Sequence, residues 1–414
     1  MHDQARRSRA AHLAALLALA AAAGLLYAQV LDTGFWSPED VHALRGVAQR
    51  RAQGELGRAF HPTLGGGYPT NPVFALEFHV FGTRARAYYI VNLVVHVLNS
   101  WMAYTLVNTL LHNRRSAWMA ALLFAVGVGS YGKNLMFASG ISSLLYAMTV
   151  LSVTLLYVVN ERRNGGRLTG GYALAFFAIF LASLFMRGGT FSILASCIFY
   201  NLFFRAERER PVFHRTLVLC LVIATLAWAG SALVGRHAIA GAVAPGAFLR
   251  NLPGYLILMA FPVQHSELLS SASGFVRSLY ALAPVIRVLV GLTFLSFSIF
   301  GIVFGNRAVR FYIAWIYVMM VPFAVFRYPA DWLNLRFLYL VSLGFCVLLV
   351  TSAVYAARLL VHRGARRWIP FVVPTFYVGL AIVLVTKLNM KNERLAARLD
   401  LQALGVDATA APER

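Results

Sequence analysis

The side chains best suited to chemistry in this chain are two adjacent carboxylates, Glu39 and Asp40, in the polar stretch 32–86 that follows the first apolar segment. A carboxylate can accept a proton from an attacking hydroxyl or amide while a phosphate departs as the leaving group. Exposure to water would keep such a group ionised, whereas shielding by a membrane and by loops would raise its pKa. The segment from Ser37 to Asp40 also fits an ordinary helix start, with an N-cap serine, a proline and two acids in the first turn. The two interpretations are compatible.

Three cations could hold an anionic group beside these acids. Arg336 stands where a polar loop enters an apolar segment, and an arginine at membrane depth tends to be functional or paired. Its planar donor fork suits a phosphate, although a side chain that snorkels to the lipid headgroups is an equally simple interpretation. Two further cations could bind a phosphate, although their positions favour this less strongly. They are Arg187, which precedes the flexible pair Gly188-Gly189, and Lys133.

The composition is that of a polytopic membrane protein. Of 414 residues, 59% are hydrophobic and 13% charged, and the mean hydropathy is +0.67. The net charge of +22 comes from basic clusters between apolar runs, so an anionic lipid surface explains it better than nucleic acid. Cys197, Cys220 and Cys346 all lie inside apolar runs, which predicts buried thiols and no disulfide framework.

Eleven segments are long and apolar enough to be candidate membrane helices. They are 11–31, 87–111, 116–130, 141–160, 170–186, 189–204, 215–234, 285–305, 311–326, 336–360 and 368–387. The first exceeds a signal-peptide core in length, so we expect it to be retained. With the N-terminus in the cytoplasm, the loops HNRRS, ERRNGGR, RAERER, NRAVR and HRGARR all face inside, as the positive-inside rule requires. The tail 388–414 then lies outside.

The predicted fold is therefore all-α: one polytopic membrane bundle over residues 1–387, with about eleven transmembrane helices. Outside it carries the long first loop 32–86, expected to bear short interfacial helices, and a second loop, 235–284. The second loop contains NLPGYLILMAFPV, which is short and interrupted by Pro253 and Pro262, and which we interpret as an interfacial or re-entrant helix. A twelfth span at 252–263 is the alternative, and it would move the C-terminus inside.

Other chemistries find little support. The histidines show no metal-ligand spacing, so no metal site is predicted. His96 and Asn99 share one face of the second predicted helix, where a hydrogen bond between helices is the simplest role. There is no phosphate-binding loop, dinucleotide fingerprint or nucleophile elbow, and the few acids in apolar segments do not favour a proton-relay transporter.

Two segments carry a resemblance to a known family. FGTRARAYYIVNLVVHVLNS resembles the second-helix signature of the membrane-bound C-type glycosyltransferases related to protein O-mannosyltransferases, in particular the tetratricopeptide-repeat O-mannosyltransferases and their bacterial relatives. LRFLYLVSLGF resembles a late-helix motif of the same family. The matching residues are Phe81, Gly82, Tyr88, Asn92, Leu93, His96, Asn99, Arg336, Tyr339, Ser342, Gly344 and Phe345; Tyr89 stands where a histidine is usual.

The resemblance implies a C-type fold in a bacterial inner membrane and a polyprenyl-phosphate-linked sugar as donor. It implies that the essential acid is Asp40 or Glu39 and that Arg336 holds the lipid phosphate, with Arg187 and Lys133 as further candidates. His96, Asn92 and Tyr339 would support the site. Neither a separate cofactor nor a divalent metal is implied, and the expected partners are membrane lipid, the lipid-linked sugar and an acceptor of unknown identity.

The sequence also departs from the family pattern. The His-Pro-x-x-x-Glu-like motif expected after the third helix lacks its histidine and proline, and Lys133 falls near its glutamate. A Lys-Glu pair expected later appears as Arg187-Gly188, and the tetratricopeptide repeats are absent from these 414 residues. The leading hypothesis is a glycosyltransferase acting on a protein or glycan at the outer face. The alternatives are a non-catalytic member that binds a lipid-linked saccharide or scaffolds an envelope partner, and a transporter of such saccharides.

Overall fold

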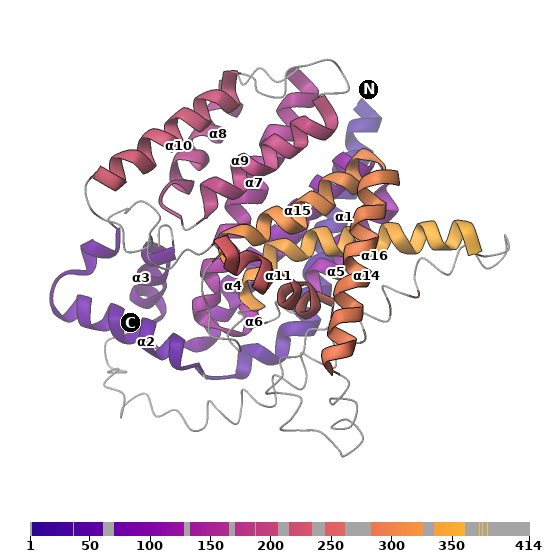
Figure 1. Ribbon diagram of the computed structural model, residues 1–414. Helices are drawn as coiled ribbons and strands as arrows, with labels where there is room; N and C mark the ends of the chain where they lie inside the picture. The colour runs from indigo at the N-terminus through magenta and orange to yellow at the C-terminus, as the bar shows by residue number, and fades with distance from the viewer. Residues whose placement is uncertain are drawn as a thin grey trace.

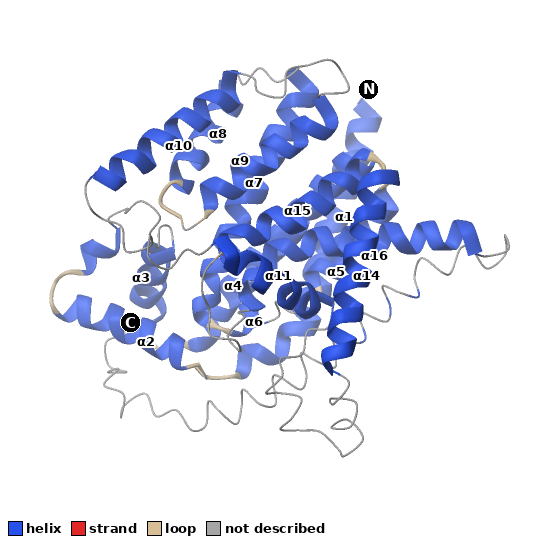
Figure 2. Ribbon diagram, viewed as in Figure 1, coloured by secondary structure: helices blue, strands red, loops and turns tan. Residues whose placement is uncertain are grey.

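The computed structural model describes residues 2–35, 37–60, 70–127, 133–164, 170–186, 188–205, 215–233, 245–260, 283–325 and 335–360, together with a few isolated positions beyond. Within these ranges every regular element is a helix, and no strand occurs there (Figure 2). The all-α class predicted from the sequence is confirmed.

Ten of the eleven predicted segments coincide with helices (Figure 1). These are α1 (His2–Tyr27), α4 (Ala85–Leu111), α5 (Arg114–Ala125), α7 (Ile141–Asn164), α8 (Gly170–Ser183), α9 (Gly189–Tyr200), α10 (Arg215–Leu233), α14 (Ala283–Phe304), α15 (Arg307–Ala324) and α16 (Leu338–Leu360). The eleventh, 368–387, falls almost wholly outside the described residues, as does the tail 388–414.

Five stretches of the described chain are long and apolar enough to cross a membrane: Ala10–Asp32, Ala85–Leu111, Ala138–Asn164, Arg307–Ala324 and Leu338–Tyr355. Shorter apolar helices occupy Gly170–Ser183, Arg215–Ala227 and Gly291–Phe304. The chain is thus a helical membrane protein, and the number eleven remains a prediction. The predicted end of the segment 116–130 was wrong, since α5 ends at Ala125. Gly127 takes a left-handed φ of 83°, which a right-handed helix cannot continue through.

The first predicted loop does carry short helices. Beyond the 3-10 turn Ala28–Asp32 come α2 (Pro38–Ala52), a second 3-10 turn at Leu56–Phe60, and α3 (Thr70–Phe81). The Ser37 side chain accepts a hydrogen bond from the Glu39 backbone N–H, and Pro38 occupies the first helical position, so the predicted helix start is confirmed. In Figure 1 the chain begins at the top, and α2 lies near the bottom with α6 (Lys133–Met136).

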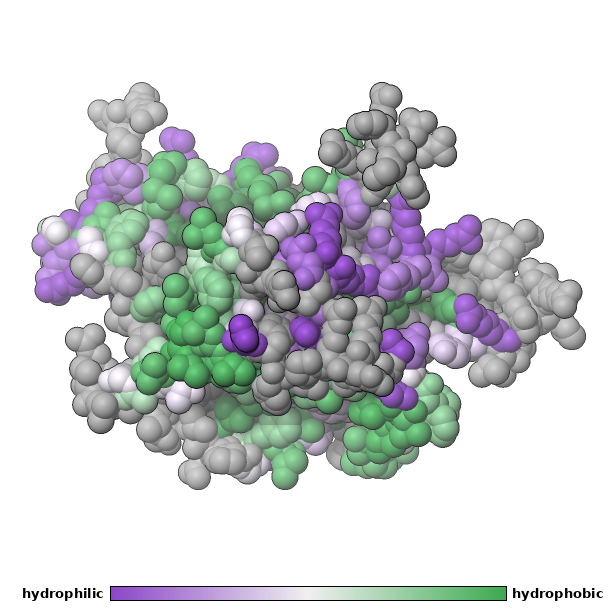
Figure 3. Space-filling view, turned by 90° about the horizontal axis from the view of Figure 1, so that it is seen from above, coloured by the Kyte–Doolittle hydropathy of each residue, from purple (hydrophilic) through white to green (hydrophobic). Residues whose placement is uncertain are grey.

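Helix α4 is central, packing against α1, α5 and α7, while α15 and α16 pair beside them. The buried apolar side chains of all these helices form one continuous cluster. Outward-facing side chains are also apolar, as on α14, where Phe297, Phe300 and Phe304 are exposed. Broad apolar areas appear on the surface in Figure 3, as expected of a surface that contacts lipid. Cys197, Cys220 and Cys346 are free and buried, as predicted.

The second predicted loop holds α11 (Pro245–Ala260), a helix of 16 residues with Pro253 inside it. It packs against α14, α15 and α16, and the Asn251 side-chain amide donates to the Ala324 carbonyl at 2.8 Å. The helix is described only as far as Ala260, so a twelfth span at 252–263 stays an untested alternative. Residues 261–263 lie outside the described chain.

Candidate active site

The carboxylate of Asp40 is the centre of the polar cluster where α2 meets the start of α7. Asp40 is 0% exposed, and its two oxygens accept the backbone N–H groups of Ala138, at 3.1 Å, and Ser139, at 2.8 Å. These two residues begin the short 3-10 turn Ala138–Gly140 that leads into α7. Asp40 therefore ties the first loop to the membrane helices through both of its oxygens.

Burial raises the pKa of Asp40, and three interactions oppose that rise: the hydrogen bonds from Ser139, the backbone bond from Ala138 and the charge of Arg336. This agrees with the prediction that shielding raises the pKa of the carboxyl group. Water does not reach this side chain, which has no exposed surface, so of the two predicted environments the shielded one applies to Asp40.

Glu39 differs from its neighbour, since its side chain is 61% exposed. One carboxylate oxygen lies 2.7 Å from Nη1 of Arg336, whose own side chain is only 12% exposed. The guanidinium also stacks over the ring of Phe137, with its central carbon 3.9 Å from the ring centroid, and its Nη1 lies 3.5 Å from Oγ of Ser139. Arg336 is thus a paired arginine whose guanidinium lies over an aromatic ring, rather than a snorkelling one.

Two amide side chains hold the backbone of this site. The side-chain amide of Asn134, in α6, donates to the carbonyl of Arg336 at 3.1 Å. That of Asn92, in α4, donates to the carbonyl of Phe137 at 2.7 Å. Asn92 thus holds the backbone next to the Phe137 ring over which Arg336 lies, and its role in a site stays a prediction. Asn134 was missed by the sequence reasoning, since an isolated asparagine in a polar segment carries no distinctive signal.

His96 and Tyr339 lie deeper in the bundle than the acids. The His96 ring bonds the Tyr339 hydroxyl at 2.7 Å and the Ala125 carbonyl at 2.9 Å, and Asn99 donates to the same hydroxyl at 3.2 Å. These bonds join α4, α5 and α16. The predicted hydrogen bond between helices is confirmed, and the support these residues give is to helix packing rather than direct contact with the acids.

Two of the predicted cations are not placed by the structure. Arg187 lies outside the described residues. Lys133 begins α6, next to the cluster in sequence, but its side chain lies outside the described part of the chain. Gly188, where the resemblance predicts an acid, is described: its φ is 72°, and it abuts Pro322 of α15.

The structure reveals one further acid that the sequence did not single out. Glu77, on the same face of α3 as Phe74 and Phe78, is buried, and neither of its oxygens has a hydrogen-bond partner in the described chain. Burial raises its pKa to about 8. A glutamate between apolar residues on one helix face could have suggested burial, but only the packing of α3 established it.

The arrangement can do acid–base and anion-binding chemistry together. A largely buried guanidinium faces an accessible carboxylate, and a second carboxylate is fixed beside it. An anionic group entering here would compete with Glu39 for Arg336. Among the described residues, no group of three or more His, Cys, Asp or Glu side chains could hold a metal ion.

Comparison with known proteins finds similarity in structure but not in sequence. No protein-family model matches the chain, and no curated protein matches it in sequence. Among solved structures, the chain is similar to the crystal structure of ArnT from Cupriavidus metallidurans bound to undecaprenyl phosphate, with 11% sequence identity and a TM-score of 0.48. The match covers 96% of this chain and 74% of that one.

Proposed function

We propose that the chain is an integral membrane glycosyltransferase that moves a sugar from a polyprenyl-phosphate-linked donor to an acceptor at the outer face. The observation that supports it most is the 2.7 Å pair between the accessible Glu39 carboxylate and Arg336, one residue from the buried Asp40. An anion-binding fork and a potential base thus share one site at the end of the bundle.

In the proposed reaction the donor phosphate binds the Arg336 guanidinium and displaces Glu39 from it. The freed Glu39 carboxylate takes the proton of the acceptor hydroxyl. The hydroxyl oxygen forms a bond to the anomeric carbon, while the bond from that carbon to the phosphate oxygen breaks and leaves its electron pair on the phosphate. Arg336 stabilises the charge of the departing polyprenyl phosphate.

Exposure assigns different roles to the two acids. Glu39 has the access that a base requires, whereas both oxygens of Asp40 are engaged by backbone N–H groups. Asp40 acts as a positioning residue that holds the start of α2 against Ser139 and so keeps Glu39 beside Arg336. The resemblance implied that either Glu39 or Asp40 is the catalytic base. We propose Glu39 for this role.

The test measures transfer and binding separately, with the full chain in phosphatidylcholine nanodiscs. Glu39→Gln should lower transfer of labelled sugar into acceptors from the source membranes by about 100-fold or more, the usual contribution of a general base. It should leave polyprenyl phosphate binding intact or tighter, because the competitor for Arg336 is weakened. Arg336→Ala should weaken that binding, and Arg336→Lys should bind more tightly than Arg336→Ala but less tightly than the wild type.

Glu55→Gln is the matched control, since Glu55 lies in the same loop and pairs with Arg58 at 2.7 Å. It should leave both transfer and binding unchanged. Wild-type transfer by Glu39→Gln would refute the assigned base. Binding that depends on Arg336 without turnover in the wild type would favour the non-catalytic alternative, which the full engagement of Asp40 also fits.

A further inference from the structure

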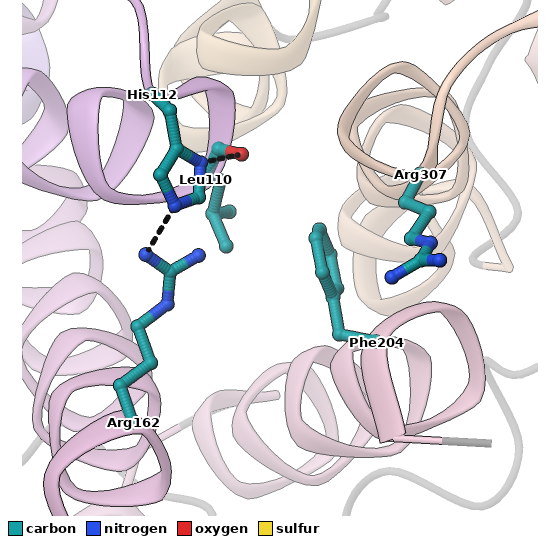
Figure 4. A pocket seen from close by; sticks show the side chains of 5 residues that line it. All are labelled: Leu110, His112, Arg162, Phe204 and Arg307. Carbon is teal, nitrogen blue, oxygen red and sulfur yellow. Dashed lines mark hydrogen bonds between the residues drawn. The ribbon is translucent and has the colours of Figure 1, made fainter. Parts of the chain in front are cut away.

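A cavity lies at the opposite end of the bundle from the acidic pair. It has a volume of about 380 Å³, within the range of roughly 300–1,000 Å³ usual for ligand sites. Its lining residues come from the last turns of α4 and α7, the π-helical turn Asn201–Arg205 and the first turn of α15. They are Leu110, His112, Arg162, Phe204 and Arg307. Figure 4 shows Arg162 and Arg307 approaching this space from opposite sides, with the Phe204 ring between them.

The arginine of α7 is held in place by a neutral imidazole. Nη1 of Arg162 lies 3.0 Å from Nε2 of His112, drawn as a dashed line in Figure 4. A guanidinium can only donate, so Nε2 accepts and the ring proton resides on Nδ1, which lies 3.3 Å from the Leu110 carbonyl. His112 caps α4 in a left-handed conformation with φ 53°, which places its ring over the helix end.

The acid nearest in sequence does not neutralise this arginine. Glu161 precedes Arg162, but its carboxylate lies 2.9 Å from Nη1 of Arg205, and both of those side chains are buried. None of the five lining residues is acidic. The cavity is bordered by the guanidinium groups of Arg162 and Arg307 and by the apolar side chains of Phe204 and Leu110.

The ends of the candidate membrane spans indicate that the cavity would lie among lipid headgroups. Three of the five candidate spans begin or end beside it: Ala85–Leu111, Ala138–Asn164 and Arg307–Ala324. The lining residues belong to or lie close in sequence to the basic clusters HNRRS, ERRNGGR, RAERER and NRAVR, so the positive-inside rule assigns this end of the helices to the cytoplasm. On α4, Asn92 contacts the acidic end and Leu110 lines the cavity, so about 27 Å of helix separates the two.

We propose that this cavity binds the phosphate of an anionic phospholipid headgroup in the cytoplasmic leaflet. Arg162 and Arg307 donate to the phosphate oxygens, for which planar forks on two sides are suited. Phe204 and Leu110 contact the glycerol and the first acyl carbons. His112 is a positioning residue for Arg162. Basic pockets between membrane helices on this side are a recurrent form of lipid headgroup recognition.

The experiment uses the full chain, purified in detergent and exchanged into nanodiscs of phosphatidylcholine with or without phosphatidylglycerol. Retained lipid is counted by native mass spectrometry. Arg162→Gln with Arg307→Gln should lower phosphatidylglycerol retention about tenfold or more. The matched control is Arg114→Gln with Arg115→Gln, which removes the same charge from two exposed residues at the start of α5 outside the cavity. It should retain the lipid as the wild type does.

Three results would overturn the proposal. They are equal loss of lipid in both double variants, equal retention of phosphatidylcholine and phosphatidylglycerol by the wild type, and displacement of the lipid by millimolar inorganic phosphate, which would indicate a soluble anion as the natural ligand. If the double variant does not fold, each single variant is measured in the same way and should show a partial loss.

Discussion

Replacing Glu77 with glutamine should abolish a loss of stability that the wild type shows as the pH rises from 5 to 7. The carboxyl group is buried on α3 without a hydrogen-bond partner in the described chain, and burial raises its pKa from 4.5 to about 8. In this interval the folded protein keeps a proton that the unfolded chain releases. The free energy of unfolding therefore falls as the pH rises.

The magnitude follows from the two pKa values. One proton retained on folding costs at most about 1.36 kcal/mol for each pH unit, and the full difference is established only near pH 8. Between pH 5 and pH 7 the loss is about 2.5 kcal/mol. Glutamine resembles the protonated acid in size and lack of charge, so Glu77→Gln should lose none of this stability over the same interval.

The assay is unfolding by sodium dodecyl sulfate in mixed micelles at pH 5, 6 and 7, with helicity as the signal. The difference in unfolding free energy between Glu77→Gln and wild type should grow with pH, whatever its value at pH 5. Glu55→Gln is the control, because its surface pair with Arg58 is worth about 1 kcal/mol or less. Parallel pH profiles for the wild type and Glu77→Gln would show that Glu77 is already ionised in the fold.

Two further predictions concern packing and use the same unfolding assay. Gly188→Ala should destabilise the fold by about 1–3 kcal/mol, because φ is 72° and the new Cβ would lie 2.6 Å from Pro322. Gly171→Ala, in open space on α8, should be neutral or stabilising, and equal losses at both glycines would contradict the reasoning. Tyr339→Phe should cost about 1–3 kcal/mol through the lost bonds to the α4 imidazole and amide, whereas Tyr355→Phe, 48% exposed, should change stability by about 0.5 kcal/mol or less. An unchanged free energy of unfolding in Tyr339→Phe would show that this hydroxyl does not stabilise the bundle.

Much of the helical framework was predictable because its signals are local. The apolar runs locate α4, α7 and α16, since the length of an apolar stretch and its polar flanks decide membrane insertion. The start of α2 was equally predictable, because Ser37 and Pro38 favour a helix start through contacts within one turn. The end of α5 was not, because a glycine only permits a left-handed φ and the surrounding chain determines whether it is used.

The sequence by itself determined which chemical groups are present: an acidic pair after the first helix, an arginine ahead of a late one, and arginine-rich loops. Tertiary structure decided what each group can do. It made Asp40 inaccessible and Glu39 accessible, and it brought Arg336 to within 2.7 Å of a carboxylate nearly 300 positions earlier in the chain. It also buried Glu77 and gathered Arg162 and Arg307 around one cavity. The physical reason is that burial and charge pairing depend on contacts between segments distant in the chain, whereas apolar length and capping depend on neighbours.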